Sequence, residues 1–166
     1  ATGYGIEFDF RKRLDFASVL TNFTFQTNLS YIFNKVNDPK VKINRPMQGQ
    51  SPYVINGSLQ YDIGKAGIST TLLFNQVGRR ILYVGNEQVP EIWENARPLL
   101  DFQIAKKVLN NKGDIRLNIS DIFNKRAYFY HDVDKSKNLK LGSTDVIAIS
   151  RNYGTTVSIS FGYSIK

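Results

Sequence analysis

The sequence contains no cysteine, and histidine, methionine and tryptophan each occur once among its 166 residues. Without cysteine the chain has no disulfide framework, thiol nucleophile or thiolate metal site. It also lacks a run of about 18 apolar residues, the length that a membrane-spanning helix requires. No proline- or serine-rich linker divides it, so the composition indicates one domain over residues 1–166.

The last stretch of the sequence, residues 155–166, alternates between large apolar and small or polar side chains. The apolar positions are Val157, Ile159, Phe161, Tyr163 and Ile165, with serine or glycine between them and Thr156 before the first. A period of two is typical of a β-strand with two different faces. About ten such residues are enough for a tilted strand to cross a bilayer, and the small polar face suits a water-filled lumen.

The same alternation recurs along the whole chain. It predicts six further strands, within residues 4–11, 22–33, 55–62, 68–75, 100–105 and 115–120. Tyr4, Tyr31, Tyr61 and Tyr163 lie at or near the ends of predicted strands, where the aromatic girdles of a membrane barrel lie. We therefore expect an all-β fold, an antiparallel transmembrane β-barrel. On this pattern the polar face carries charges that point into the lumen, namely Glu7, Asp9, Asp62, Asp101 and Arg116.

The connections between the predicted strands alternate in length. Short links fall near residues 11–18, 63–67 and 109–113, and long links near 34–51, 85–98 and 126–144. Outer-membrane barrels have short periplasmic turns and long outer loops, so we expect Ala1 on the outer side and the C-terminus in the periplasm. Seven strands are an odd number and too few for a normal wall. The sequence therefore predicts a piece of a larger barrel, with earlier strands in the same polypeptide.

The formal net charge of +8 raises the possibility of a nucleic-acid partner. The basic residues, however, gather in the connections, and they do not share a strand face with interleaved aromatic side chains as in an oligonucleotide-binding sheet. We expect no nucleic-acid partner. Cations at strand ends suit anionic lipid head groups and lipopolysaccharide phosphates, although solvated loop charge without a specific partner explains them equally well.

Four motifs, in order along the chain, resemble parts of one family. Residues 45–61 (RPMQGQSPYVINGSLQY) and 97–104 (RPLLDFQI) resemble two late descending strands of TonB-dependent outer-membrane receptors, particularly those of Bacteroidetes. Residues 118–125 (NISDIFNK) are similar to an element near the C-terminus of these receptors, and residues 153–159 (YGTTVSI) to their last strand. The resemblance covers most of the chain.

The resemblance implies a closed barrel of about 22 strands around an N-terminal plug. Residues 1–166 would then be the C-terminal part of that barrel, without the plug and the earlier strands. The implied function is active import of a large or scarce solute, such as a siderophore or a glycan. The implied partners are the protein's own plug domain, the TonB complex acting through the missing N-terminal region, outer-membrane lipid and lipopolysaccharide, and a surface lipoprotein.

Catalytic and metal-binding patterns are weak in this sequence. His131, Asp132 and Asp134 form a small polar cluster, but the segment lacks the central glycine and closing glutamate of a calcium loop. No serine has the spacing of a nucleophile elbow. We expect no enzymatic activity, no cofactor and no metal.

Candidate ligand-binding residues lie in or beside the long links, because recognition usually sits on loops carried by a rigid wall. Arginine and aromatic side chains are favoured at binding hot spots. The candidates are Arg45, Arg79, Arg80, Tyr83, Trp93, Tyr128 and His131. Two alternatives remain open at this point: a small structural or adhesive outer-membrane barrel, and a soluble β-sandwich that acts as a binding module.

Overall fold

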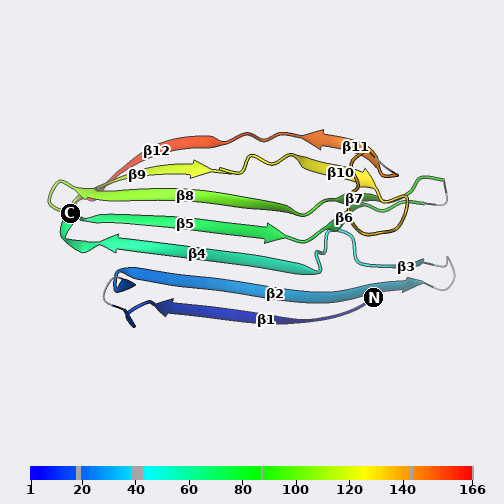
Figure 1. The fold of residues 1–166 in the computed structure, drawn as a ribbon, viewed down its shortest axis with the longest axis horizontal. Coiled ribbons are helices and arrows are strands. Elements are labelled where there is room, and N and C mark those ends of the chain that lie inside the picture. The colour runs from blue at the N-terminus through cyan, green and yellow to red at the C-terminus, as the bar shows by residue number, and fades with distance from the viewer. Residues whose placement is uncertain (18–19, 39–42, 87, 143, 166) are drawn as a thin grey trace.

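The computed structural model describes residues 1–17, 20–38, 43–86, 88–142 and 144–165. Seven long strands form one antiparallel sheet, in which each strand lies beside the next along this series (Figure 1). In spatial order they are β1 (Thr2–Arg13), β2 (Phe23–Asp38), β4 (Tyr53–Ile63), β5 (Ile68–Val77), β8 (Arg97–Val108), β9 (Gly113–Ser120) and β12 (Thr156–Tyr163). Each of the seven segments with alternating side chains overlaps one of these strands. The short β3 (Ile43–Arg45) pairs with the end of β2.

The register of the sheet collects the apolar side chains on one face. Phe8 pairs with Leu29, which pairs with Ile55 on its other side, and Ile159 pairs with Leu117. Large side chains of this face stay exposed, 76 % for Ile6 and 75 % for Ile159. In a soluble sandwich a second sheet would pack over such a face. The exposed face therefore suits contact with lipid and argues against the sandwich.

Short links join the strands at one end of the sheet. The β4–β5 link contains a single 3-10 turn, η2 (Gly64–Ala66), which ends at Gly67 in the left-handed conformation with φ +60°. The β8–β9 link places three consecutive residues, Leu109, Asn110 and Asn111, at positive φ. Among the residues that the structure describes, no helix has the length and apolar character needed to cross a membrane. The last strand, β12, runs toward this turn end, where the C-terminus lies (Figure 1).

The long links contain strands of their own, which the sequence analysis missed. β6 (Arg80–Tyr83), β7 (Ile92–Glu94), β10 (Ala127–His131) and β11 (Val146–Arg151) form a second sheet in the order β11-β10-β7-β6. The expectation of simple loops over 85–98 and 126–144 was therefore wrong, and β2 continues through residues 34–38, which were expected to open a loop. These strands are short and pair across long sequence separations, so they leave little local alternation to detect. We call the second sheet the cap sheet.

The buried core of the chain lies in the cap sheet and not between the long strands. Ile81 and Tyr130 are completely buried, and Ala127 and Phe129 nearly so. The cap sheet lies beyond the ends of β5 and β8, at the end of the long sheet opposite the C-terminus (Figure 1). The long strands thus form a wall with two exposed faces, and the long links fold into a packed structure at one end of it.

Candidate functional site

The polar face of the long sheet carries a row of hydrogen-bonded amides across four neighbouring strands. Asn75 Nδ2 of β5 donates to Asn56 Oδ1 of β4 over 2.6 Å, and Asn56 Nδ2 donates to Asn28 Oδ1 of β2 over 3.3 Å. Asn28 Nδ2 then donates to the carboxylates of Glu7 and Asp9 on β1, at 2.7 and 2.8 Å. The register places all five residues on one face, because Asn28 pairs with Asp9 and Asn56, and Asn56 with Asn75. We call this row the amide ladder.

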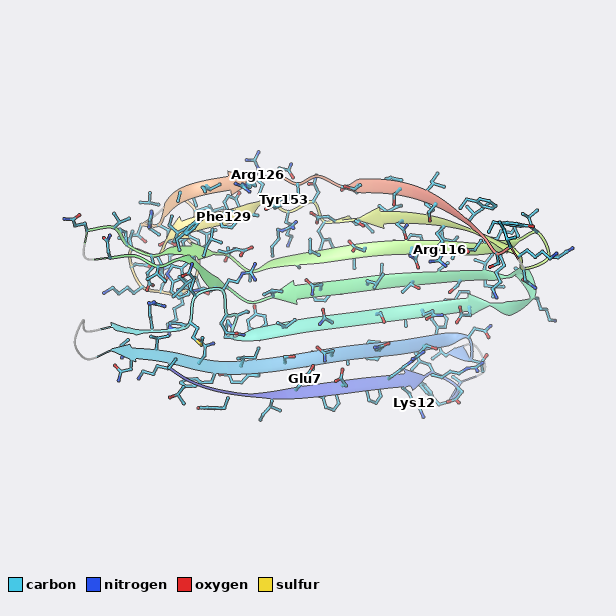
Figure 2. The ribbon with its side chains drawn as sticks, turned by 180° about the vertical axis from the view of Figure 1, so that it is seen from behind. Glu7, Lys12, Arg116, Arg126, Phe129 and Tyr153 are labelled. Atoms are coloured by element: carbon cyan, nitrogen blue, oxygen red, sulfur yellow. The ribbon has the colours of Figure 1, made fainter. Side chains whose placement is uncertain are left out.

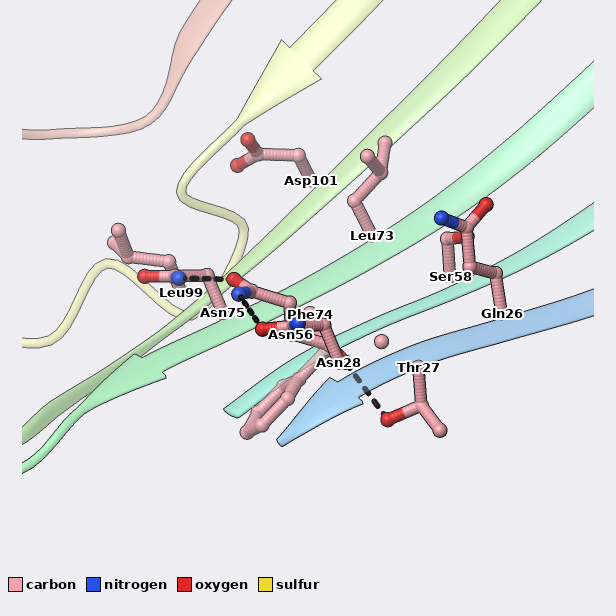
Figure 3. A pocket seen from close by; sticks show the side chains of 11 residues that line it. Gln26, Thr27, Asn28, Asn56, Ser58, Leu73, Phe74, Asn75, Leu99 and Asp101 are labelled. Carbon is pink, nitrogen blue, oxygen red and sulfur yellow. Dashed lines mark hydrogen bonds between the residues drawn. The ribbon is translucent and has the colours of Figure 1, made fainter. Parts of the chain in front are cut away.

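A wide, open groove of about 520 Å³ lies over the amide ladder (Figure 3). Apolar side chains, among them Leu73 and Leu99, line it together with the polar side chains of Gln26, Asn28, Asn56, Ser58, Asn75 and Asp101. These groups offer amide donors and amide, hydroxyl and carboxylate acceptors. Such a surface binds water, sugar hydroxyls or the polar backbone of another chain segment. The charges expected in the lumen lie on this polar face, as the strand register shows for Glu7, Asp9, Asp62, Asp101 and Arg116.

The polar face continues toward the last strand with a smaller network. Gln103 Nε2 on β8 donates to Asn118 Oδ1 on β9 over 2.7 Å, and Asn118 Nδ2 donates to Ser158 Oγ on β12 over 3.4 Å. Arg116 forms an exposed ion pair with Asp114, at 2.7 Å. Hydrogen-bonded side chains therefore lie on the polar face in two groups, one from β1 to β5 and one from β8 to β12.

Arg79 joins the wall to the cap sheet. It follows the end of β5, and its guanidinium lies over the Trp93 ring of β7, 3.7 Å from the ring centroid. Nη1 donates to Asp132 Oδ2 over 2.8 Å and to the Tyr130 hydroxyl over 2.9 Å. The side chains of Arg79 and Asp132 are 13 % and 5 % exposed, so this ion pair is largely removed from solvent.

The hydroxyl of Tyr130 has a raised pKa because burial disfavours its charged form. The Arg79 guanidinium lowers that pKa by charge and by hydrogen bonding, whereas the carboxylates of Asp132 and Asp145 raise it. At neutral pH Tyr130 is therefore a neutral hydroxyl that accepts from Arg79.

A second arginine, Arg97, connects the start of wall strand β8 to the long link that follows β9. Arg97 Nη1, at the start of β8, lies 2.5 Å from Asp121 Oδ2, and its guanidinium carbon lies 5.1 Å from the centroid of the Tyr153 ring. The backbone N–H of Asp121 donates to Asp101 Oδ1 over 2.8 Å. Tyr153 and Arg126, labelled in Figure 2, lie toward the cap end of the molecule, away from Lys12 at the turn end.

The structure places the seven predicted ligand-binding residues in or next to the cap sheet and β3, but in different environments. Arg79 and Trp93 contact each other inside the cap, so the guanidinium of Arg79 is already engaged. Arg80 pairs with Glu94 at 2.7 Å and is partly exposed. Tyr83, at the end of β6, is 58 % exposed. The remaining three are half-buried: Arg45, which ends β3, and Tyr128 and His131, both on β10.

Sequence reasoning missed the amide ladder as a unit and missed Tyr130 and Asp145 in the cap. The three asparagines of the ladder were visible as polar-face residues, but only the register of β2, β4 and β5 shows that they are neighbours. Asp145 lies 13 positions after Asp132, beyond the span of the calcium-loop pattern that was considered.

A single-layer antiparallel sheet with an exposed apolar face, a hydrogen-bonded polar face and short turns at one end defines the wall of a membrane β-barrel. The chain belongs to the outer membrane protein beta-barrel family, whose sequence model matches residues 1–162. The protein is accordingly an outer-membrane protein. The comparison with curated proteins gave no match, and neither did the comparison with solved structures.

Proposed function

We propose that residues 1–166 are the C-terminal wall and outer loops of a TonB-dependent transporter, which imports a large or scarce solute such as a siderophore or a glycan. The observation that carries this proposal is the wide polar face of an open sheet. The path of paired long strands begins at β1 and ends at β12 without closing. Small closed barrels fill their interior with side chains, whereas this face bears an open groove over the amide ladder.

The proposed complete barrel has about 22 strands, the number found in outer-membrane transporters with a plugged lumen. Its further strands and its plug domain come from sequence outside residues 1–166. The amide ladder and the carboxylates of Glu7, Asp9 and Asp101 would form hydrogen bonds with that plug. The TonB complex would act through the region before the plug. It would use the inner-membrane proton gradient to open the path of the solute through the barrel.

The cap sheet is the proposed outer entrance. Tyr83 is its most exposed ligand candidate, while Arg79 and Trp93 serve as internal support because they already contact each other. Lipopolysaccharide and outer-membrane lipid would contact the apolar face and the basic residues near the strand ends. A surface lipoprotein above the cap sheet is a further proposed partner. Neither an enzymatic reaction nor a nucleic-acid partner belongs to this proposal.

The proposal is tested on the intact protein in two measurements. In planar lipid bilayers, a plugged transporter should give no steady ion conductance, and mild urea treatment that loosens the plug should open one. In cells, uptake of a panel of ferric siderophores and oligosaccharides should stop when a protonophore removes the proton gradient. A steady open conductance, together with uptake that continues in the presence of the protonophore, would instead identify a passive barrel. Absence of both conductance and uptake, with adhesion to surfaces, would identify a structural or adhesive barrel.

A further inference from the structure

Three carboxylates meet in the β10–β11 hairpin of the cap sheet. Asp132 directly follows β10, Asp134 lies two residues later, and Asp145 directly precedes β11. One carboxylate oxygen from each residue lies within 4.8 Å of the other two. Asp145 lies 11 positions after Asp134 in the sequence. The pairing of β10 with β11 nevertheless brings it next to Asp132 and Asp134.

Two oxygens in this group are buried and have no hydrogen-bond partner in the part of the chain that the structure describes. Asp132 Oδ2 accepts from Arg79 Nη1 and from the Lys137 N–H, and Asp145 Oδ2 accepts from the Lys140 N–H. Among the described residues, none donates a hydrogen bond to Asp132 Oδ1 or to Asp145 Oδ1. The Asp132 side chain is 5 % exposed and Asp145 is 9 % exposed. A buried carboxylate oxygen without a donor is costly, so we expect a water molecule or a cation to bind there.

The cations already present do not satisfy these two oxygens. Arg79 binds only Oδ2 of Asp132, and the Lys140 ammonium binds Asp134 Oδ2 over 2.6 Å. In the described part of the chain, the three carboxylates thus form ion pairs with one guanidinium and one ammonium. The pair of Lys140 and Asp134 is the most exposed part of the group, so water competes with it and the lysine side chain is free to turn away.

We propose that Asp132, Asp134 and Asp145 bind a calcium ion, which ties the start of β11 to the end of β10. Calcium takes oxygen ligands at about 2.3–2.6 Å, so that two oxygens on opposite sides of the ion are about 4.6–5.2 Å apart. The convergence of the three carboxylates within 4.8 Å fits that spacing. Zinc and copper prefer nitrogen or sulfur ligands, and the three converging groups offer oxygen alone.

The calcium site rests on the cap geometry and not on transport, so either proposal survives failure of the other. In the proposed orientation, with the long links outside, the site is on the outer side of the membrane, and calcium modules that work outside the cell bind with dissociation constants of about 10⁻⁴–10⁻³ M. Because Lys140 competes with calcium for Asp134, we expect a calcium affinity in the weaker part of the range found for protein calcium sites. Water molecules and nearby backbone carbonyls would complete the coordination.

Terbium luminescence provides the test, because Tb³⁺ replaces Ca²⁺ in oxygen sites and is sensitised by nearby tyrosine. Arg79 bridges the Tyr130 hydroxyl and Asp132, so Tyr130 is close to the proposed ion. The intact protein in detergent micelles, stripped with EDTA, should show terbium emission on tyrosine excitation. Calcium chloride should compete for that emission with a midpoint of about 10⁻⁴–10⁻³ M.

Matched variants distinguish the site from other carboxylates. Asp145→Asn keeps an acceptor for the Lys140 N–H and should weaken terbium binding about tenfold or more, because one of three charged ligands is lost. Asp15→Asn, in the β1–β2 link at the turn end, should leave binding unchanged. Lys140→Met removes the competing ammonium and should strengthen binding. Because Asp134 is exposed, Asp134→Asn serves as the informative variant if Asp145→Asn fails to fold.

Two results would overturn the proposal. The first is the absence of calcium-competed emission in both the unmodified protein and Lys140→Met. That result would mean that the three carboxylates bind no calcium ion, even without the competing ammonium. The second is emission that stays unchanged in both Asp145→Asn and Asp134→Asn, which would place the bound metal elsewhere.

Discussion

The guanidinium of Arg79 is stacked on the Trp93 ring at 3.7 Å and at the same time forms an ion pair with Asp132 at 2.8 Å. Arg79 follows β5 of the wall, Trp93 belongs to β7, and Asp132 follows β10. One side chain thus links a wall strand to two strands of the cap sheet. A desolvated cation–π contact is worth about 2 kcal/mol, and the pair with Asp132 is largely buried.

Replacing Arg79 should loosen the cap sheet while the wall remains assembled. Arg79→Met removes the partner of a carboxylate that is 5 % exposed, and breaking a buried pair from one side costs about 3–5 kcal/mol. Because these contacts lie in the cap, the long strands should keep their hydrogen bonds. Hydrogen exchange measured by mass spectrometry in micelles should speed up in peptides that cover β7 and β10, with peptides from β2 and β4 unchanged.

Arg80→Met is the matched control for that experiment. Arg80 pairs with Glu94 at a similar distance, 2.7 Å, but the two side chains are 39 % and 27 % exposed. Partly solvated pairs contribute about 0–1 kcal/mol, so exchange in the cap should change little. Equal acceleration in both variants would show that burial of the Arg79 pair does not hold the cap sheet in place.

The seven long strands were predictable from the sequence because their signal is local. A strand with one face in lipid and one in water must alternate between apolar and polar side chains. The sequence alone therefore indicates lipid around Ile159 and water around Ser158. The cap sheet gave no such signal. Its strands are three to six residues long, and Phe129 and Tyr130 are both buried although they are adjacent, so alternation fails where both faces are covered.

The candidate site was predictable only in part, for a related physical reason. The loop arginines and aromatic residues stay predicted ligand-binding residues, and composition does not show that the guanidinium of Arg79 is already engaged inside the cap sheet. That outcome depends on a contact between Arg79 and Asp132, which are 53 positions apart. The asparagines of the amide ladder likewise become neighbours only through strand register.

Gly78 should be intolerant of any side chain. It connects β5 to the cap, and a Cβ atom there would lie 2.7 Å from the Tyr53 ring and 2.8 Å from Ser51 Oγ. Ser51 is buried, and the half-buried Tyr53 accepts a hydrogen bond from Gln76 at its hydroxyl, so neither neighbour moves away freely. Gly78→Ala should destabilise the protein by about 1–3 kcal/mol, the usual cost of overpacking. The urea midpoint of unfolding, followed by the shift in electrophoretic mobility of the unheated protein, measures this change.

Gly57→Ala provides the comparison in the neighbouring strand β4. A Cβ atom at Gly57 meets no atom within 4 Å. The alanine should therefore be tolerated, and it should stabilise the strand slightly because it restricts the unfolded chain. A loss of stability in Gly57→Ala as large as that in Gly78→Ala would mean that the joint at Gly78 has room for a methyl group.

The assignment of the two faces of the wall predicts opposite outcomes for neighbouring positions of β12. Ile159 lies in the middle of the strand on the apolar face and is 75 % exposed, whereas Ser158 lies on the polar face opposite Asn118. Ile159→Arg should impair membrane assembly by about 2–4 kcal/mol, the cost of a charge on the lipid face at mid-bilayer. Ser158→Arg should be mild, because its charge would enter a wet lumen.

Refolding of the intact protein into lipid vesicles distinguishes these outcomes. The fraction that becomes resistant to external protease and shows the folded mobility should fall sharply for Ile159→Arg and little for Ser158→Arg. The pair is informative because both variants add the same charge to the same strand one residue apart, so the net charge changes equally. Equal damage would mean that both faces of β12 meet the same environment. That result would contradict a wall with lipid on one side and water on the other.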